Sequence, residues 1–270
     1  MRRVGAYRLD RVIGEGATGV VYAARGEAGR VAVKVLRPEY ADDGVVRARF
    51  VREARLAGSI ESPHVVPILE LGEVDGLTYL VMPFLGGGSL AGRLRTLGQL
   101  SLAETVALAA QLGRGLDALH DVGVLHRDVK PSNVLLDGDG RAALSDFGLA
   151  RAADSTRLTS AGQLLGSLHY LAPELIQCGA ATPASDVYAL GCLLYECLTG
   201  APPFTGRSPA EIGFAHLAES PPDPRRCRPE LPGEIVAALG AALEKDPGAR
   251  PTSGTALARM LHVARNAQPL

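Results

Sequence analysis

Apolar and polar residues alternate in two stretches near the start of the chain, Tyr7 to Leu36 and Val65 to Phe84. Both stretches are rich in β-branched residues, which is typical of strands, and Asp75-Gly76 marks a tight turn within the second. Arg47 to Ser59 differs, because its apolar residues recur at helical spacing. They are Phe50, Ala54, Leu56 and Ala57. The pattern predicts a β-rich N-terminal part with one main helix.

Helical spacing dominates the rest of the chain. Ser101 to Glu104 has the pattern of a capping box, and the helix that it opens should end near Gly123. Its apolar positions are Val106, Ala109, Leu112, Leu116 and Leu119. A second, hydrophobic helix is expected from Val187 to Thr199, capped by Ser185-Asp186 and ended by Gly200.

A short hairpin interrupts this helical part. Val134 to Leu136 and Ala142 to Leu144 flank a turn-forming run, Asp137 to Gly140, which predicts two paired strands. Further on, Ser208 to Glu211 opens another helix with a cap, a proline and a box glutamate. Pro221 to Pro232 is expected to form a loop, because prolines recur through it.

Composition narrows the class of protein. The 270 residues carry a net charge of −1 and a pI near 6.6, so no strong field attracts nucleic acid or an anionic membrane. We see no signal peptide, and the apolar runs are interrupted before they reach the length of a membrane span. The cysteines form no C-x-x-C pair, so reduced thiols are expected. We therefore expect a cytoplasmic protein that binds no nucleic acid and has no membrane span.

A glycine-rich motif lies in the first alternating stretch. Gly14 to Val21 fits the pattern G-x-G-x-x-G-x-V, in which missing side chains let backbone N–H groups approach phosphates. A dinucleotide-binding fold is the alternative, but it requires a helix after the glycines. Here Val20 to Ala23 continues as a strand, which favours a flap over a nucleotide.

One lysine follows the glycines on the next predicted strand. Only three of the 28 basic residues are lysines, and Lys34 is one of them, flanked by valines. The two-residue period of a strand puts Ala32 and Lys34 on one face, and that face would look toward the nucleotide. The alternative is an exposed lysine on an edge strand.

Two motifs in the helical part carry groups suited to phosphate chemistry. His126 to Asn133 matches H-R-D-x-x-x-x-N, although a polar turn after a helix could contain the same residue types. Asp146-Phe147-Gly148 follows the predicted hairpin, whose pairing would return Asp146 to the side of Asn133. Their oxygen atoms are ligands of the kind that Mg²⁺ prefers.

Together these motifs resemble those of a bacterial eukaryotic-like serine/threonine protein kinase, and the resemblance runs from Tyr7 to Leu261. It implies an α+β, bilobal protein-kinase fold, with a β-rich N-lobe, one main N-lobe helix and a mostly helical C-lobe. The expected single domain covers residues 1–265, with the N-lobe at about 1–82, the hinge at about 83–88, the C-lobe at about 89–265 and a tail at 266–270.

The resemblance implies a role for each motif residue. Asp128 would accept the proton of the substrate hydroxyl, and Lys130 would lie near the transferred phosphate. Lys34 would contact the ATP phosphates and pair with Glu53, for which a surface ion pair with Arg49 is the alternative. Asn133 and Asp146 would hold Mg²⁺ or Mn²⁺. The residues expected to bind ATP are Ile13, Gly14, Glu15, Gly16, Ala17, Thr18, Gly19, Val20, Val21, Ala32, Lys34, Met82, Pro83 and Leu85.

The resemblance also implies an activation segment, Asp146 to Glu174, that closes with Ala172-Pro173-Glu174. Thr159 and Ser160 are the preferred autophosphorylation sites, with Thr156 and Ser167 as further candidates, and Arg127 would pair with the phosphate. The alternative is a polar loop. Ser167 and Tyr170 would belong to the platform that receives a peptide, and the Ser167 hydroxyl would be able to reach Asp128. Three residues would have structural roles: Glu174 and Arg250 as a buried ion pair, and Asp186 as an acid bonded to the backbone of the catalytic loop, His126 to Asn133.

The function implied is transfer of the γ-phosphate of ATP to serine or threonine hydroxyls of proteins, including the chain itself. A silent ATP-binding pseudokinase scaffold is one alternative, although such proteins usually lack an equivalent of Lys34, Asp128 or Asp146. A small-molecule phosphotransferase is another, but it would need no peptide platform. The expected partners are protein substrates, and the resemblance leaves open a homodimer formed through the N-lobe.

Overall fold

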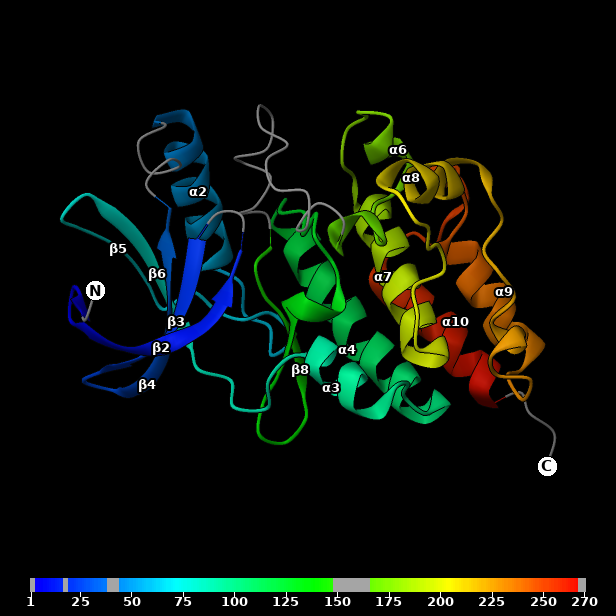
Figure 1. Ribbon diagram of the computed structural model, residues 1–270, viewed down its shortest axis with the longest axis horizontal. Coiled ribbons are helices and arrows are strands. Elements are labelled where there is room, and N and C mark those ends of the chain that lie inside the picture. The colour runs from blue at the N-terminus through cyan, green and yellow to red at the C-terminus, as the bar shows by residue number, and fades with distance from the viewer. Residues whose placement is uncertain (1–2, 17–18, 38–43, 148–165, 267–270) are drawn as a thin grey trace.

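The computed structural model describes residues 3–16, 19–37, 44–147 and 166–266. Figure 1 shows two lobes side by side, a β-rich N-lobe in blue and cyan and a mostly helical C-lobe in green to red. The predicted α+β, bilobal architecture is confirmed.

The N-lobe is built on one antiparallel sheet of six strands in the order β1-β2-β3-β4-β6-β5. The strands are β1 (Arg3–Val4), β2 (Tyr7–Glu15), β3 (Gly19–Gly26), β4 (Gly29–Leu36), β5 (Glu70–Val74) and β6 (Leu77–Pro83). Alternate side chains of β4 take opposite faces: Val31, Val33 and Val35 join an apolar cluster, which leaves Ala32 and Lys34 on the other face. The predicted turn at Asp75-Gly76 is present, and both residues have positive φ.

In the described part of the N-lobe, one helix, α2 (Gly44–Ala57), accompanies this sheet. It begins earlier than the predicted Arg47. Phe50 and Ala54 are buried with Leu36 and Leu80 of the sheet, so the expected apolar positions attach the helix to the strands.

The C-lobe consists of helices around one apolar core, with the hairpin of β7 (Val134–Leu136) and β8 (Ala142–Leu144) at its boundary with the N-lobe. The α-helices are α3 (Leu90–Leu97), α4 (Leu102–Asp121), α6 (Pro173–Ile176), α7 (Pro183–Thr199), α8 (Pro209–Ala218), α9 (Gly233–Ala242) and α10 (Gly254–Asn266). Short 3₁₀ turns occur at η1 (Pro131–Asn133), η2 (Pro224–Arg226) and η3 (Pro247–Ala249). The capping box at Ser101 is present, and so is the hairpin, with Val134 opposite Leu144.

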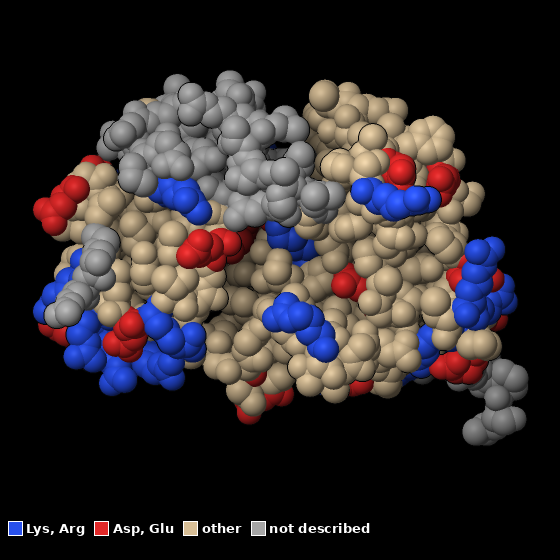
Figure 2. Space-filling view, in the orientation of Figure 1, with Lys and Arg blue, Asp and Glu red and all other residues tan. Residues whose placement is uncertain are grey.

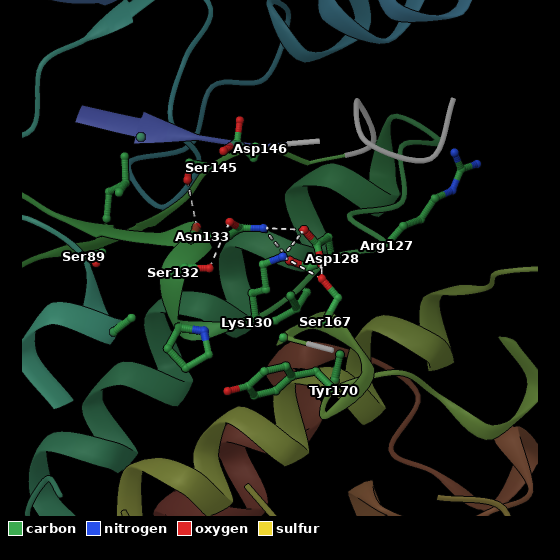
Figure 3. Close-up of a pocket in the computed structure, with 18 of the residues that line it drawn as sticks. Ser89, Arg127, Asp128, Lys130, Ser132, Asn133, Ser145, Asp146, Ser167 and Tyr170 are labelled. Atoms are coloured by element: carbon green, nitrogen blue, oxygen red, sulfur yellow. Dashed lines mark hydrogen bonds and ion pairs between the residues drawn. The ribbon is translucent and has the colours of Figure 1, made fainter. Parts of the chain in front are cut away.

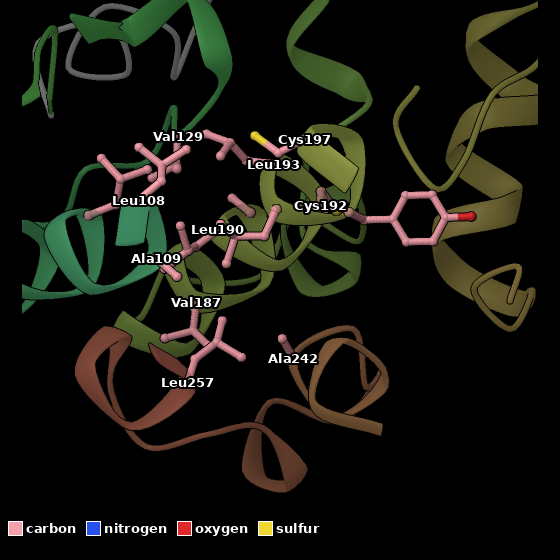
Figure 4. Close-up of a cluster of buried hydrophobic side chains, with 14 of the residues drawn as sticks. Leu108, Ala109, Val129, Val187, Leu190, Cys192, Leu193, Cys197, Ala242 and Leu257 are labelled. Carbon is pink, nitrogen blue, oxygen red and sulfur yellow. The ribbon is translucent and has the colours of Figure 1, made fainter. Parts of the chain in front are cut away.

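Helix α7 lies at the centre of this lobe. Nearly all of its residues are buried, and Figure 4 shows Leu190, Leu193 and Cys197 facing side chains from α4 and from the catalytic loop. All four cysteines are free, and Cys192 and Cys197 serve as packing residues in the core. In the described part of the chain no helix is both long enough and apolar enough to cross a bilayer.

The expected cap of α7 was wrong. The helix starts at Pro183 with Thr182 as its N-cap, so Ser185 and Asp186 lie in the first turn. Ser185 Oγ accepts a hydrogen bond of 3.1 Å from the Thr182 N–H, which fixes the start of the helix. Pro183 is suited to the first helical position because its missing N–H needs no partner there.

Two helices at the end of the chain, α9 and α10, were not predicted. Pro232 precedes α9 and offers no side-chain cap. The first amides of α10 are instead capped by Asp117 of α4, which accepts from Gly254 N at 2.9 Å and from Thr255 N at 3.1 Å. A Cβ at Gly113 of α4 would come within 2.6 Å of the Gly254 carbonyl oxygen, so glycine is needed for this close helix contact.

Candidate active site

A continuous cavity lies between the lobes and takes its lining from both. Lys34 of the N-lobe, Asp128 of the catalytic loop and Asp146 after β8 all line it. The predicted ATP-binding residues along the cavity are Ile13, Gly14, Glu15, Gly16, Val21, Ala32, Lys34, Met82, Pro83 and Leu85. The three charged groups that phosphoryl transfer needs therefore share one space.

Two of the predicted ATP-binding residues that the structure describes are not among those lining the cavity. Gly19 and Val20 are described but lie outside the lining. Val20 pairs with Val35, whereas Val21 pairs with Lys34, so Val20 is on the opposite face of the sheet. Ala17 and Thr18 lie outside the described residues.

Lys34 links the two lobes. Its side chain is 5% exposed, and Nζ donates a hydrogen bond of 2.6 Å to Asp146 Oδ1. A buried ammonium group needs such a partner, because removal from water is costly without one. The predicted partner Glu53 is on α2, but its side chain lies outside the described part of the structure.

Asp146 is held in its ionised form. Burial favours the neutral acid, but the neighbouring Lys34 ammonium outweighs this effect and keeps the pKa of Asp146 below its ordinary value. The backbone of Asp146 is left-handed, with φ of 57°. A non-glycine residue in this conformation is strained, and such strain is often found at functional sites.

The catalytic loop forms a hydrogen-bonded cluster around Asp128 (Figure 3). Lys130 Nζ lies 2.8 Å from Asp128 Oδ2 and donates to Ser167 Oγ at 2.7 Å. The Ser167 hydroxyl in turn donates to Asp128 Oδ1 at 3.0 Å. A hydroxyl can therefore sit between this carboxylate and this ammonium group, as a substrate hydroxyl would need to do.

Asn133 is oriented by the same carboxylate. Its Nδ2 donates to the side chain and to the backbone carbonyl of Asp128, both at 2.8 Å, so its amide oxygen points elsewhere. As predicted, the hairpin brings the chain back to the side of Asn133. The Ser145 N–H donates to the Asn133 carbonyl oxygen at 2.8 Å, and the Ser145 hydroxyl donates to the same oxygen at 3.0 Å. Asp146 follows immediately. Asn133 and Asp146 both line the cavity, and an amide oxygen and a carboxylate are ligands that suit a hard divalent cation.

Asp186 holds the backbone of the catalytic loop. It accepts hydrogen bonds from the backbone N–H groups of His126, at 2.9 Å, and of Arg127, at 2.8 Å. His120 Nε2 lies 2.8 Å from the same side chain. Arg127 has a φ of 64°, so these bonds hold a backbone conformation that costs energy. Figure 3 shows the Arg127 side chain extending away from Asp128.

Sequence reasoning missed two residues of this framework, His120 and Ser145, and gave no role to His126, the first residue of the H-R-D-x-x-x-x-N motif. His126 is fully buried, and its ring lies edge-on to Phe147 with 6.3 Å between ring centroids. Burial lowers the pKa of His126, so the ring is neutral and acts as a packing group. The alternation of the hairpin could have indicated Ser145, but no local pattern indicates a contact between His120 and Asp186.

A buried ion pair holds Glu174, where the predicted activation segment ends. Arg250 donates to both carboxylate oxygens of Glu174, at 2.9 and 2.8 Å, and Ser185 donates to the same carboxylate at 2.6 Å. The Arg250 guanidinium also lies over the ring of Tyr188, 4.8 Å from its centroid. Three predicted phosphorylation sites, Thr156, Thr159 and Ser160, lie outside the described residues.

Ser167 and Tyr170 both line the cavity, as a peptide platform requires. The Tyr170 hydroxyl donates to Glu196 of α7 at 2.5 Å. Burial raises the pKa of Glu196, and the bond from Tyr170 opposes that rise. The platform is therefore tied to the central helix of the C-lobe.

Comparison with known proteins gives a consistent result. The family model described as protein kinase domain matches residues 7–262. The chain is 42% identical over 262 residues to serine/threonine-protein kinase PknE of Mycobacterium tuberculosis, covering 96% of this chain and 46% of that protein. PknH of the same organism is 41% identical to the chain, and the match covers 96% of this chain and 42% of PknH. The chain thus spans less than half the length of these curated relatives.

A solved structure agrees with the sequence comparisons. The kinase domain of M. tuberculosis PknI is similar to this chain with a TM-score of 0.75 and 31% sequence identity, over 96% of each chain. Because the family model covers nearly the whole sequence and the relatives exceed 40% identity, the chain belongs to the protein kinase family and, within it, groups with bacterial serine/threonine protein kinases.

Proposed function

We propose that this chain transfers the γ-phosphate of ATP, bound with Mg²⁺ or Mn²⁺, to serine and threonine hydroxyls of proteins. The observation that carries the proposal is the convergence of Lys34, Asp128 and Asp146 on one cavity between the lobes. A pseudokinase scaffold would not require all three groups in one place. The kinase domain would cover residues 1–265, with the hinge at about 83–88.

Each group has a task that follows from its position. Asp128 would orient the acceptor hydroxyl and take its proton, since its carboxylate already accepts a hydrogen bond from the Ser167 hydroxyl. Lys130, 2.8 Å from Asp128, would neutralise charge on the phosphate during transfer. Lys34 would hold the nucleotide phosphates. The metal ion, when bound, would neutralise phosphate charge, and Asn133 and Asp146 would hold it.

The adenine would lie against Ala32, Met82, Pro83 and Leu85, all of which line the cavity. Pro83 lacks an N–H group, so its backbone contact with the adenine would be through its carbonyl. The peptide platform at Ser167 and Tyr170 supports a protein acceptor over a small molecule. Autophosphorylation at Thr156, Thr159, Ser160 or Ser167 stays a prediction, as do the cytoplasmic location and the homodimer.

The test compares the wild-type chain with Asp128→Asn for phosphate incorporation from labelled ATP, both into a basic protein and into the chain itself. We expect Asp128→Asn to lower the rate by about 10³-fold, within the usual range for loss of a catalytic base. Asp139→Asn is the matched control, since it makes the same change on a carboxylate that is 80% exposed. Incorporation by the Asp128→Asn protein at a near wild-type rate would remove Asp128 from its proposed role.

A further inference from the structure

Four arginines stand directly opposite one another across the first four strands of the N-lobe sheet. Arg3 pairs with Arg8, Arg8 with Arg25, and Arg25 with Arg30. Directly opposed residues of antiparallel strands project from the same face of the sheet. All four are exposed, and their Cα positions form one line of about 14 Å, given a strand spacing of about 4.8 Å. We call these residues the arginine row.

The positive charge of the row is only partly balanced. Among the described residues, the ion pairs recorded for the row lead to Asp10, which lies 3.7 Å from Arg8 Nε and 3.1 Å from Arg25 Nε. Arg3 donates to the backbone oxygen of Ala6. Like charges directly opposite each other destabilise a sheet. The row therefore weakens the fold that carries it, which points to a role other than stability.

The location of the row indicates what it can contact. Arg30 precedes Ala32 and Lys34 on the same face of β4, so the row continues the face that covers the nucleotide cavity. The Arg30 guanidinium lies over the ring of Phe84 in the hinge, 4.1 Å from its centroid. No residue of the row is among those that line the cavity. Figure 2 shows basic side chains gathered at the lower left, over β2 and the β3–β4 hairpin. The row thus lies outside the nucleotide site, on an open margin beside the hinge.

We propose that the arginine row is a docking surface for an extended acidic segment of a protein partner. Guanidinium groups form two parallel hydrogen bonds to one carboxylate, which favours acidic side chains as ligands. An extended segment presents alternate side chains on one face every ~6.8 Å, so three acidic residues would span the row. The narrow line of charge suits a polypeptide strand better than the broad plane of a membrane. The net charge of −1 for the whole chain gives no general attraction to nucleic acid.

The test is fluorescence anisotropy of a labelled peptide of alternating Glu and Ala residues, titrated with the complete chain at low and at high salt. We expect binding that weakens with salt, because exposed charges are screened. Arg8→Glu combined with Arg25→Glu should reduce the affinity at least about tenfold. The matched control combines Arg207→Glu with Arg259→Glu, two exposed C-lobe arginines whose reversal changes net charge equally. The control should bind the peptide as the wild type does.

Other outcomes would overturn the proposal. Equal peptide binding by the row variant and the control would show a general charge effect. Binding of the wild type to phosphatidylserine vesicles but not to the peptide would assign the surface to a membrane. If the wild type binds no peptide and the row variant has a raised KM for ATP, the arginine row attracts the nucleotide instead.

A neutral variant separates binding from folding. Arg8→Gln combined with Arg25→Gln should weaken peptide binding, though less than the charge reversal does, while the melting temperature stays the same or rises, because repulsion within the row is removed. A lower melting temperature would show that the row stabilises the sheet and would contradict the argument from charge repulsion.

Discussion

Ser167 occupies, at the scale of a single residue, the place between Asp128 and Lys130 that an acceptor hydroxyl needs. Its Oγ lies 3.0 Å from the carboxylate and 2.7 Å from the ammonium group. Because both charged groups bond to this hydroxyl, it holds them in one geometry. The residue was predicted as part of the platform, with a hydroxyl able to reach Asp128, and as a phosphorylation candidate, but its hydrogen bond from Lys130 became visible only in the structure.

Ser167→Ala should therefore lower kcat by about 10²-fold, a typical cost of losing such positioning. Ser167→Thr keeps the hydroxyl and should stay within a few-fold of the wild type. Initial rates with a fixed protein substrate measure both variants. A Ser167→Ala protein that is as fast as the wild type would show that Ser167 merely fills the acceptor position.

At the scale of elements, the Glu174–Arg250 pair connects α6 with the segment after η3. The Arg250 side chain is fully buried and that of Glu174 is 16% exposed. Arg250→Met should reduce the free energy of unfolding by about 3–5 kcal/mol, because it leaves a largely buried carboxylate without its partner. Urea unfolding measures the change. Arg207→Met, at an exposed arginine, is the matched control and should leave the unfolding free energy nearly unchanged.

The same pair predicts a pH dependence. Burial raises the pKa of Glu174, but hydrogen bonds from Arg250 and Ser185 more than offset this and leave it below the ordinary value of 4.5. A folded-state pKa below that of the unfolded chain means stability that is complete above about pH 4.5 and is lost as the pH falls through the folded-state value. Urea unfolding of Glu174→Gln should thus show a smaller loss of stability on acidification than the wild type. Equal losses in both proteins would contradict this assignment.

At the scale of the whole molecule, the candidate site exists only where the two lobes meet. Lys34 and Asp146 come from different lobes and are 112 residues apart in sequence, yet they form a contact of 2.6 Å. A ligand that binds both lobes in the folded state stabilises that state by mass action.

Mg-ATP at about 100 times its Kd should add about 2.7 kcal/mol and raise the melting temperature by several degrees. Asp128→Asn should keep this rise, since the proposed role of Asp128 concerns the acceptor and not the nucleotide. Asp146→Asn should lose the part of the rise that depends on magnesium. Differential scanning fluorimetry with and without Mg²⁺ measures it. An undiminished magnesium effect in Asp146→Asn would exclude Asp146 as a metal ligand.

Local patterns in the sequence were sufficient for strands β2 to β6 of the N-lobe, for α4 and for the β7–β8 hairpin, because each depends on residues close together in the chain; β1 lies before the predicted stretch. The capping box at Ser101 and the turn at Asp75-Gly76 are of this kind. The start of α7 was misplaced, because Asp186 resembles a cap but bonds to the catalytic loop instead. Helix α10 was missed because Asp117, on a distant helix, caps its first amides.

By itself, the sequence determined which residue types lie at motif spacing: the glycines of the flap, Lys34, Asp128, Asn133 and Asp146. Spacing along a strand or loop is local, so it can be read without coordinates. Only the tertiary structure decided the partner of Lys34, the bond from Lys130 to Ser167 and the alignment of the arginine row. Those features depend on strand register and on contacts between distant segments, which side-chain periodicity within one segment does not specify.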